Sequence, residues 1–500
     1  MLHFVQQNNT IHTTTRATSI APLAKIFRFC LLAKLPFYFR GVNSAYLRDL
    51  VLRLEGMRSS FLKELLQMPQ SASLPHFVLR RVELPLSVGG LGLRIPLPDL
   101  CYSASLSSVK SFIEDHIQND RLSFSSYIQP LNLYGSREDF DAAVPQQILQ
   151  QQRDKFLHKK LCDALLRFNV DDETTEPEED AHLGSSSVRR LHLNVLLSSG
   201  GPIAGLWLLA FQHDALNAAD FTSALRTRLA LPQVGWDLVP ECNCGQALAA
   251  QRAYHHLVCC RSTMKYARHN RIRDTFAAMF RKAGLFFRVE PHGVLTDDDR
   301  GRPDLILREL GGAATKVFDV KCTTCTTVSQ LAIQNPKAGQ SAKAKVAETI
   351  RDYRARHDGT VIPLVLEAHG FVDEGVLKLL RDTARAAAAN PIKRWDSESF
   401  MSEWSRKLSV QAQRGVAELA HDVRHRCFHR QRAHIRAHHL GGAGIPEAHG
   451  AFNAELPPGL FRTTLARAIE RRMHAIAHNI DPLGYASWIR FRAPTLHIGG

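Results

Sequence analysis

The sequence lacks an apolar run long enough to cross a membrane. Its most apolar stretch, residues 191–211, is interrupted by Gly200, Gly201 and Pro202, and neither half approaches the roughly 20 residues that a span needs. We therefore expect two buried segments there and no membrane partner. The first ten residues contain no apolar core of a secretory signal. Ten cysteines are also too few, in a chain of 500 residues, for a disulfide-built scaffold.

Acidic residues are missing before Asp49. A start with basic and hydroxyl residues but no acids is typical of a mitochondrial transit segment, although a plain basic helix has the same composition. Over the whole chain, 63 Lys and Arg against 48 Asp and Glu leave a net charge of +15. This excess favours a polyanionic partner such as nucleic acid. Internal repeats are absent too, which argues against a solenoid or a propeller.

Apolar periodicity divides the chain into a helical N-terminal half and a mixed segment. An acidic run at residues 171–180, typical of a linker, interrupts the helical half. Strand-like and helical stretches then alternate, which predicts an α/β domain with a central mixed sheet flanked by helices. A helical, basic and histidine-rich extension follows Pro391. The strand-like runs are 304–308, 316–322 and 361–366, and the helical stretches are 268–282, 338–356 and 375–389.

Four cysteines and two histidines fall between residues 242 and 260. C-x-C and H-x-x-x-C hooks can each supply two ligands to tetrahedral zinc, and Gly245 lets the chain turn after the first hook. The doubled residues leave the register open, because His255 and Cys259 have the same spacing as the pair that we favour. Reduced, partly buried cysteines are the plainer interpretation. We expect structural zinc bound by Cys242, Cys244, His256 and Cys260.

A second group of charged residues follows the cysteines. Asp319 and Lys321 alternate with apolar residues, so in a strand they share one face. Gly311-Gly312 marks a turn before this run, and a hairpin there brings Asp304 beside Asp319. Two adjacent carboxylates attract Mg²⁺ or Mn²⁺, and a metal-bound water near Lys321 could attack a phosphodiester. Glu290 could add a third carboxylate. The plainer interpretation of Asp304, Asp319 and Lys321 is a surface salt bridge at the hairpin.

The order of these motifs resembles the C-terminal part of non-LTR retrotransposon proteins that carry a restriction-like endonuclease of the PD-(D/E)xK class. The resemblance covers about residues 186–385. It extends weakly to residues 84–93, which look like the block after the reverse-transcriptase thumb. The matching residues are Cys242-Asn243-Cys244-Gly245, His256-x3-Cys260, Arg268-His269-Asn270, Arg273-Asp274, Val289-Glu290-Pro291, Arg302-Pro303-Asp304-Leu305, Phe318-Asp319-Val320-Lys321, Lys345, Tyr353, Pro363-Leu364-Val365-Leu366-Glu367 and Gly370.

The resemblance implies an endonuclease that nicks target DNA so that the element can prime reverse transcription at the cut. The element's RNA is a second candidate partner, and a nuclear location follows from the DNA substrate. By position, Asp304 and Asp319 would hold the metal and Lys321 would orient or activate the water. Glu290 would assist, and Lys345 and Tyr353 would lie at the edge of the site. Arg268, His269 and Arg273 would contact nucleic acid, with bracing of the zinc hook as the alternative for Arg268 and His269. For Arg268, a salt bridge on the helix surface is equally compatible with the sequence.

The resemblance implies that the chain begins near the polymerase thumb. It contains no paired-aspartate strand of a polymerase palm, so we expect a truncated or decayed element without reverse transcriptase activity. The expected segments are 1–135 (helical thumb and post-thumb remnant), 136–185 (helical and acidic linker), 186–240 (helical connector), 241–270 (zinc hook), 271–390 (restriction-like endonuclease) and 391–500 (basic, histidine-rich helical extension).

Two features lie outside the family pattern. Cys322 and Cys325 flank the predicted active strand and are expected in the core. Residues 421–439 contain five arginines and six histidines, which suits contact with nucleic-acid phosphates, although an exposed basic helix without a partner fits equally. The alternative to an endonuclease is a catalytically inactive nucleic-acid-binding zinc protein, a relic of such an element. A structural zinc protein is a third interpretation.

Overall fold

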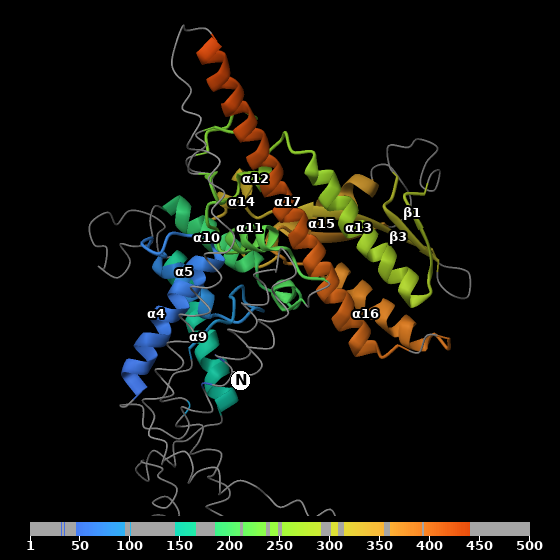
Figure 1. The fold of residues 1–500 in the computed structure, drawn as a ribbon. Coiled ribbons are helices and arrows are strands. Elements are labelled where there is room, and N and C mark those ends of the chain that lie inside the picture. The colour runs from blue at the N-terminus through green and yellow to red at the C-terminus, as the bar shows by residue number, and fades with distance from the viewer. Residues whose placement is uncertain are drawn as a thin grey trace, which may run out of the picture. The chain divides into compact units, whose positions relative to one another are not determined.

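A computed structural model describes a mostly helical chain with one small sheet (Figure 1). It divides into two compact units, residues 1–432 and 433–500. None of the described helices is long and apolar enough to cross a membrane. The predicted transit-like start and acidic linker lie largely or wholly outside the described residues. Those residues are 47–95, 146–166, 186–210, 214–236, 241–248, 253–291, 302–308, 315–354, 361–392 and 395–440, with Leu32, Leu35 and Cys101.

The N-terminal part of the first unit is helical, as the periodicity predicts. Its helices pack around one apolar core that contains Leu62, Val78, Leu196 and Trp207, all at most 1% exposed. The α-helices are α4 (Arg48–Leu65), α5 (His76–Glu83), α9 (Gln146–Leu166), α10 (Ser186–Ser198) and α11 (Ala218–Arg228), and the short 3₁₀ helix is η5 (Leu206–Leu209).

The glycine-rich block at residues 84–93 forms a tight turn beside this core. Gly89 and Gly92 have positive φ values of 91° and 64°, a conformation that residues with a Cβ rarely adopt. At Gly90 an added Cβ would lie 1.9 Å from the Leu84 carbonyl oxygen. Two buried arginines bind the turn: Arg81 Nε donates to the Gly89 carbonyl at 3.1 Å, and Arg228 Nη2 donates to that of Gly90 at 3.1 Å. Close backbone approach and positive φ thus explain why glycine occupies these positions.

The sheet has the order β1-β2-β3-β4. The first three strands are antiparallel, and β4 lies parallel to β3. The predicted hairpin is therefore present, as β2 and β3, and the predicted third strand is β4. The sheet is mixed, as expected, and it gains a short edge strand, β1, that the periodicity does not predict. The strands are β1 (Phe286–Val289), β2 (Leu305–Arg308), β3 (Thr315–Thr323) and β4 (Val361–Glu367).

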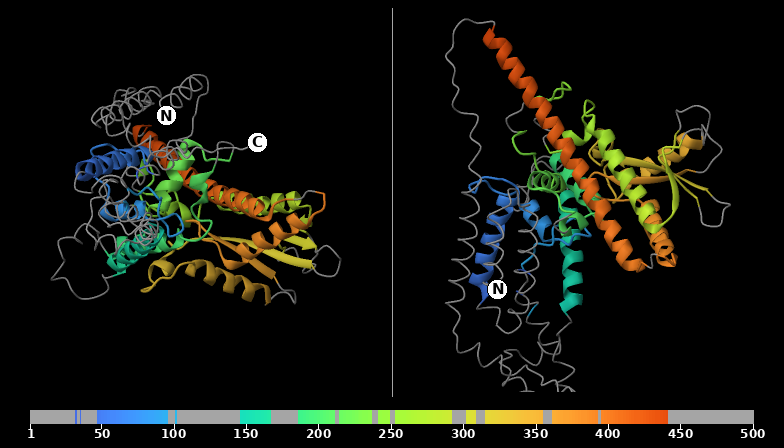
Figure 2. Two further views of the ribbon diagram at one scale, coloured as in Figure 1. Left: turned by 90° about the horizontal axis from the view of Figure 1, so that it is seen from below. Right: turned by 45° about the vertical axis from the view of Figure 1, so that its right-hand side comes forward.

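Helices cover both faces of the sheet (Figure 2). On one face, Phe318 and Val320 of β3 belong to the same core as Phe280 of α13. That core also includes residues of α16 and α17. The other face carries α15, where Ser341 Oγ lies 3.0 Å from Thr323 Oγ1 of β3. The helices of this part are α12 (His255–Val258), α13 (Met264–Ala283), α14 (Val328–Leu331), α15 (Gln340–Arg354), α16 (Glu374–Ala389) and α17 (Ser397–Leu440).

Helix α17 begins inside the segment predicted as a separate extension, yet its first half packs in the core against the sheet. Phe400 and Leu408 are buried at 0% and 1% exposure, and both pack in the core beneath the sheet. Gly415 lies at a close crossing with α13, because an added Cβ would come within 2.6 Å of Arg268 Cγ. The first compact unit extends to Arg432.

Phe400→Ala should destabilise the protein by about 3–5 kcal/mol, because it removes a fully buried ring and leaves a cavity. Ile392→Ala is the matched control, because Ile392 is 89% exposed and should cost less than about 0.5 kcal/mol. Chemical denaturation of both variants measures the difference. Equal stabilities would show that α17 does not belong to this core.

The protein should also lose stability in acid through His192. Burial, reinforced by the charge of Arg81, lowers the pKa of His192 to about 3, whereas the unfolded value is about 6.5. Between these values only the unfolded chain takes up this proton, so the free energy of unfolding falls by up to about 1.4 kcal/mol per pH unit as the pH drops. Denaturation at pH 5–7.5 should show a shallower pH slope for His192→Gln than for wild type, and identical slopes would contradict the prediction.

Candidate functional sites

The cysteine and histidine side chains of the hook converge on one point. A short turn holds the first pair: the Cys242 amide donates to the Gln246 carbonyl at 2.9 Å, and Gly245 has a positive φ of 85°. The second pair lies on α12, where the Cys259 amide donates to the His255 carbonyl at 2.8 Å. Ligand atoms of Cys242, Cys244, His255 and Cys259 all lie within 4.8 Å of one another. We call these four residues the zinc hook.

Two distances within the zinc hook match those between ligands of a tetrahedral ion. Cys242 Sγ and Cys259 Sγ are 3.7 Å apart, and Cys244 Sγ lies 3.5 Å from His255 Nε2. Zinc bonds of about 2.3 Å to sulfur and about 2.0 Å to nitrogen separate two sulfurs by about 3.8 Å, and sulfur from nitrogen by about 3.5 Å. A disulfide would need about 2.05 Å. The four side chains therefore fit a structural metal ion such as zinc.

The register of the second pair differs from the predicted one by one residue. His256 is fully buried, and its Nε2 lies 3.1 Å from Thr227 Oγ1 of α11, while Cys260 is exposed. Both i,i+4 pairs would share a helical face. The contact of His256 with Thr227 directs its ring toward α11, whereas His255 Nε2 lies 3.5 Å from Cys244 Sγ and Cys259 lies beside Cys242.

Three carboxylates lie in one row at the end of the sheet. The β1–β2 register pairs Val289 with Leu305, and the β2–β3 register pairs Leu305 with Phe318. Glu290 follows β1, Asp304 directly precedes β2 and Asp319 lies on β3, so all three acids lie at this end of the sheet. The Glu290 amide donates to the Asp304 carbonyl at 2.9 Å and the Asp304 amide to the Phe318 carbonyl at 3.1 Å, and the carboxyl groups of Asp304 and Asp319 interact directly. We call Glu290, Asp304 and Asp319 the acid row.

Each member of the acid row has a basic partner. His269 Nε2 of α13 lies 3.1 Å from Asp304 Oδ2, and the Lys321 ammonium lies 2.7 Å from Asp319 Oδ2. Glu290 forms ion pairs with Arg273 and Arg302. Asp304 and Asp319 are buried, at 8% and 2% exposure, whereas the side chain of Glu290 is 35% exposed. The two buried acids and Lys321 thus form the inner part of the site.

The pKa values of the two buried acids move apart. Burial raises the pKa of Asp319 to about 6; Asp304 adds to this effect and Lys321 opposes it. Burial also opposes ionisation of Asp304. The hydrogen bond from His269 and the bond from the Val320 amide to Asp304 Oδ2 at 2.6 Å outweigh this burial and lower the pKa of Asp304. For His269, the pairing with Asp304 overcomes burial and raises the pKa.

Asp304 and Asp319 are two buried carboxylates that interact directly. The Lys321 ammonium, 2.7 Å from Asp319 Oδ2, offsets part of their repulsion. A divalent cation relieves the repulsion between two adjacent carboxylates. The donor set of Asp304 and Asp319 therefore fits Mg²⁺ or Mn²⁺, with water completing the coordination.

The other predicted site residues are more scattered. Lys345 of α15 forms an ion pair with Glu348 at 2.6 Å, and Tyr353 lies near the end of the same helix. Arg268 is buried at 5% exposure where α13 crosses α17, which favours a bracing role over phosphate contact. Arg273 is engaged with Glu290 and Asp274. The contact between His269 and Asp304 has no sequence signal, because it depends on how α13 packs against β2.

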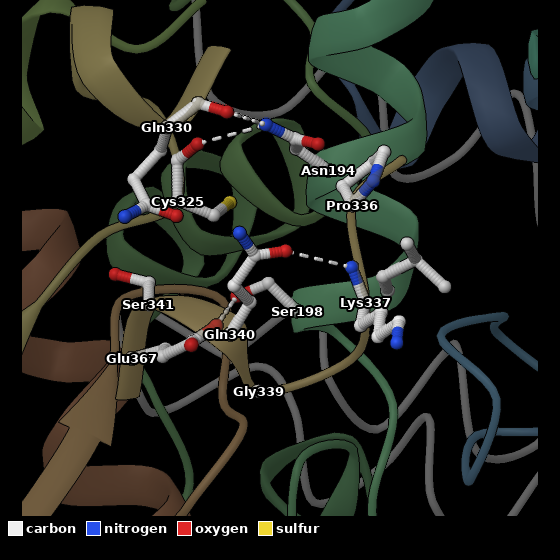
Figure 3. A pocket seen from close by; sticks show the side chains of 11 residues that line it. Asn194, Ser198, Cys325, Gln330, Pro336, Lys337, Gly339, Gln340, Ser341 and Glu367 are labelled. Atoms are coloured by element: carbon white, nitrogen blue, oxygen red, sulfur yellow. Dashed lines mark hydrogen bonds between the residues drawn. The ribbon is translucent and has the colours of Figure 1, made fainter. Parts of the chain in front are cut away.

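A small cavity lies where Asn194 and Ser198 of α10 face Cys325, Ser341 of α15 and Glu367 of β4 (Figure 3). It holds about 10 Å³, room for one water molecule at most. Asn194 Nδ2 donates across it to the carbonyls of Cys325 at 3.2 Å and Gln330 at 3.1 Å. Ser198 bonds to the buried Glu367, which also accepts from the Ala342 amide at 2.7 Å. These bonds fasten α10 to the sheet, and the cavity is too small for a nucleotide.

Cys259→Ser should lose bound zinc, whereas Cys260→Ser should keep it. Serine oxygen is a poor substitute for a thiolate ligand of zinc, and Cys260 is exposed outside the zinc hook. Metal analysis after dialysis should give about one zinc per chain for wild type and Cys260→Ser, and far less for Cys259→Ser. Loss of zinc in Cys260→Ser with retention in Cys259→Ser would restore the other register.

No protein-family model matches the sequence, and no curated protein is significantly similar to it. The function of the chain is therefore inferred from the side chains of the zinc hook and the acid row.

Proposed function

We propose that the protein is a metal-dependent DNA endonuclease of the PD-(D/E)xK class, derived from a non-LTR retroelement. The observation that supports this most is the acid row with Lys321 beside it. Asp304 directly precedes β2, Asp319 lies on the neighbouring antiparallel strand β3, and Lys321 follows Asp319 on the same face of β3. Two carboxylates and an ammonium group in this arrangement suit hydrolysis of a phosphodiester.

Asp304 and Asp319 would hold Mg²⁺ or Mn²⁺ at this site. When bound, the ion would neutralise charge on the phosphate and make a coordinated water more acidic. The chain's own contribution is to keep both carboxylates in place: the Val320 amide and His269 fix Asp304, while the core packing of Phe318 and Val320 fixes β3. Such fixed geometry spares the reaction the cost of reorganising these groups.

Lys321 would act on the water or on the phosphate. Its side chain is 33% exposed, so the ammonium group reaches from the buried Asp319 toward solvent. There it could hold a water for attack or stabilise the negative charge that develops on a phosphate oxygen. Glu290 is bound by two arginines, which suits an assisting role more than a role as metal ligand.

The charge of the chain supports DNA as the substrate. A net charge of +15 favours association with a polyanion. The resemblance to retrotransposon proteins adds target nicking as the biological setting, with the element's RNA as a further partner and the nucleus as the place of action. A polymerase palm is not part of this proposal, so reverse transcription would depend on another protein.

Incubation with supercoiled plasmid and Mg²⁺ or Mn²⁺ tests the proposal. Wild type should convert the plasmid to the nicked form, and Asp319→Asn should slow nicking by about 100-fold or more, because the substitution removes a charge that holds the metal. The matched control is Asp382→Asn, which changes an acid of α16 paired with Arg385 and should nick at the wild-type rate.

DNA binding separates the proposal from its alternative. Asp319→Asn should bind DNA at least as tightly as wild type, because it removes negative charge near the phosphates. Wild type that binds DNA but does not nick it with either metal would instead be the catalytically inactive nucleic-acid-binding zinc protein. Nicking that persists in Asp319→Asn would also contradict the assignment of the site.

A further inference from the structure

Helix α13 turns one of its faces toward the acid row. His269 of this helix lies 3.1 Å from Asp304 Oδ2, and about one turn later Arg273 forms an ion pair with Glu290. Tyr266 lies three residues before His269 and seven before Arg273, and residues at these spacings share a face of an α-helix. Tyr266 therefore belongs to the helix face that contacts the acid row.

The ring of Tyr266 is open to solvent. Its exposed fraction is 78%, the highest of any Phe, Tyr or Trp side chain among the described residues, ahead of 71% for Phe286 and 64% for Phe156. Tyrosine joins an apolar ring to a polar hydroxyl, which suits a surface that is wet in the free protein and covered when a partner binds. The ring is thus available to a ligand that approaches the acid row.

The surroundings of Tyr266 favour a phosphate backbone. Lys265 and Arg261 are exposed, and the first turn of α13, which begins at Met264, contains no acidic residue. The positive end of the helix dipole adds to these charges. Proteins bind single-stranded nucleic acid with such a combination, in which bases stack on aromatic rings while phosphates lie against cationic groups.

We propose that Tyr266 stacks on an unpaired base beside the phosphate that is cut, so that the protein binds DNA with locally separated strands more tightly than paired duplex. The helical rise of about 1.5 Å per residue places Tyr266 about 4.5 Å along α13 from His269, and His269 contacts the acid row. Successive bases of a strand are about 3.4 Å apart. A phosphate at Asp304 and Asp319 therefore brings a neighbouring base within reach of the ring.

The inference rests on the proposed function, because it takes the acid row as the place where the phosphate binds. It adds the kind of DNA: in a paired duplex the bases are stacked on one another, and a side chain reaches the face of a base only after that base has left the stack. Every base has an aromatic face, so stacking is tolerant of base identity. Tyr266 would accordingly select the structure of the DNA and not its sequence.

DNA binding by the full-length protein tests the proposal. The probes are a fluorescent duplex and the same duplex with a run of mismatched pairs at its centre, a bubble, with Ca²⁺ in place of Mg²⁺. Wild type should bind the bubble about 10-fold or more tightly than the duplex. Tyr266→Ala should weaken bubble binding by about 10-fold or more and duplex binding by less than about twofold. Tyr266→Phe should bind both like wild type, because the ring remains.

Phe156→Ala is the matched control, because it removes an exposed aromatic ring from α9 and should bind both DNAs like wild type. Tyr266 is exposed, so its substitution should leave the fold intact, and unchanged duplex binding by Tyr266→Ala checks this. Equal bubble affinity of wild type and Tyr266→Ala would overturn the proposal, as would an equal loss in Tyr266→Phe. A Tyr266-dependent preference for RNA of the same sequence over the bubble would also overturn it.

Photocrosslinking locates the stacked base. 5-Iodouracil at successive positions of the bubble should crosslink to Tyr266 most strongly beside the phosphate that wild type cuts, and absence of this crosslink at every position would overturn the proposal. Plasmid nicking separates the two proposals. Nicking together with Tyr266-independent bubble binding would overturn this inference alone. Tyr266-dependent bubble binding without nicking in Mg²⁺ or Mn²⁺ would overturn the nuclease and still support stacking by Tyr266.

Discussion

Strand register is the constraint on which the candidate nuclease site depends. Asp304 meets Asp319 only because Leu305 pairs with Phe318. A slip of one residue would turn every side chain of β3 to the opposite face of the sheet and put Asp319 into the apolar core. Two kinds of interaction stabilise the observed register. Phe318 and Val320 pack in the core that α13 completes, and the Val320 amide donates to Asp304.

Local sequence patterns predict the acids of the candidate site and most of the sheet. Alternation around Asp319 and the glycines before β3 predict the hairpin, and the run at residue 361 predicts β4. The edge strand β1 has no such signal, because it is only four residues long and Phe286 is 71% exposed. The partnership of His269 with Asp304 is likewise invisible, because 35 residues separate them and only the packing of α13 on the sheet brings them together.

The ligands of the zinc hook are also only partly predictable from the sequence. The residue types and their spacing predict a four-ligand site, but two i,i+4 pairs satisfy that spacing equally. Thr227, which lies outside the hook, decides between them, because its hydroxyl lies 3.1 Å from His256 Nε2 and leaves His255 to the cysteines. Similarly, the basic composition after residue 391 indicates an extension, whereas Phe400, Leu408 and Cys427 show that α17 belongs to the core. In both cases, contacts between residues far apart in the sequence decide the outcome, and composition does not show these contacts.

The short span of the zinc hook has a consequence for the order of folding. Cys242 and Cys259 are 17 residues apart, while Ser262 and Asp422, which join the hook to α17, are 160 apart. Closing the longer loop costs about 2 kcal/mol more in chain entropy. The hook can therefore bind a metal ion while the C-terminal part of the chain is still unfolded. Helix α17 then docks on a hook that is already folded. Metal supplied after that docking would have to enter a buried site, so the timing of metal supply would affect how fast the chain matures.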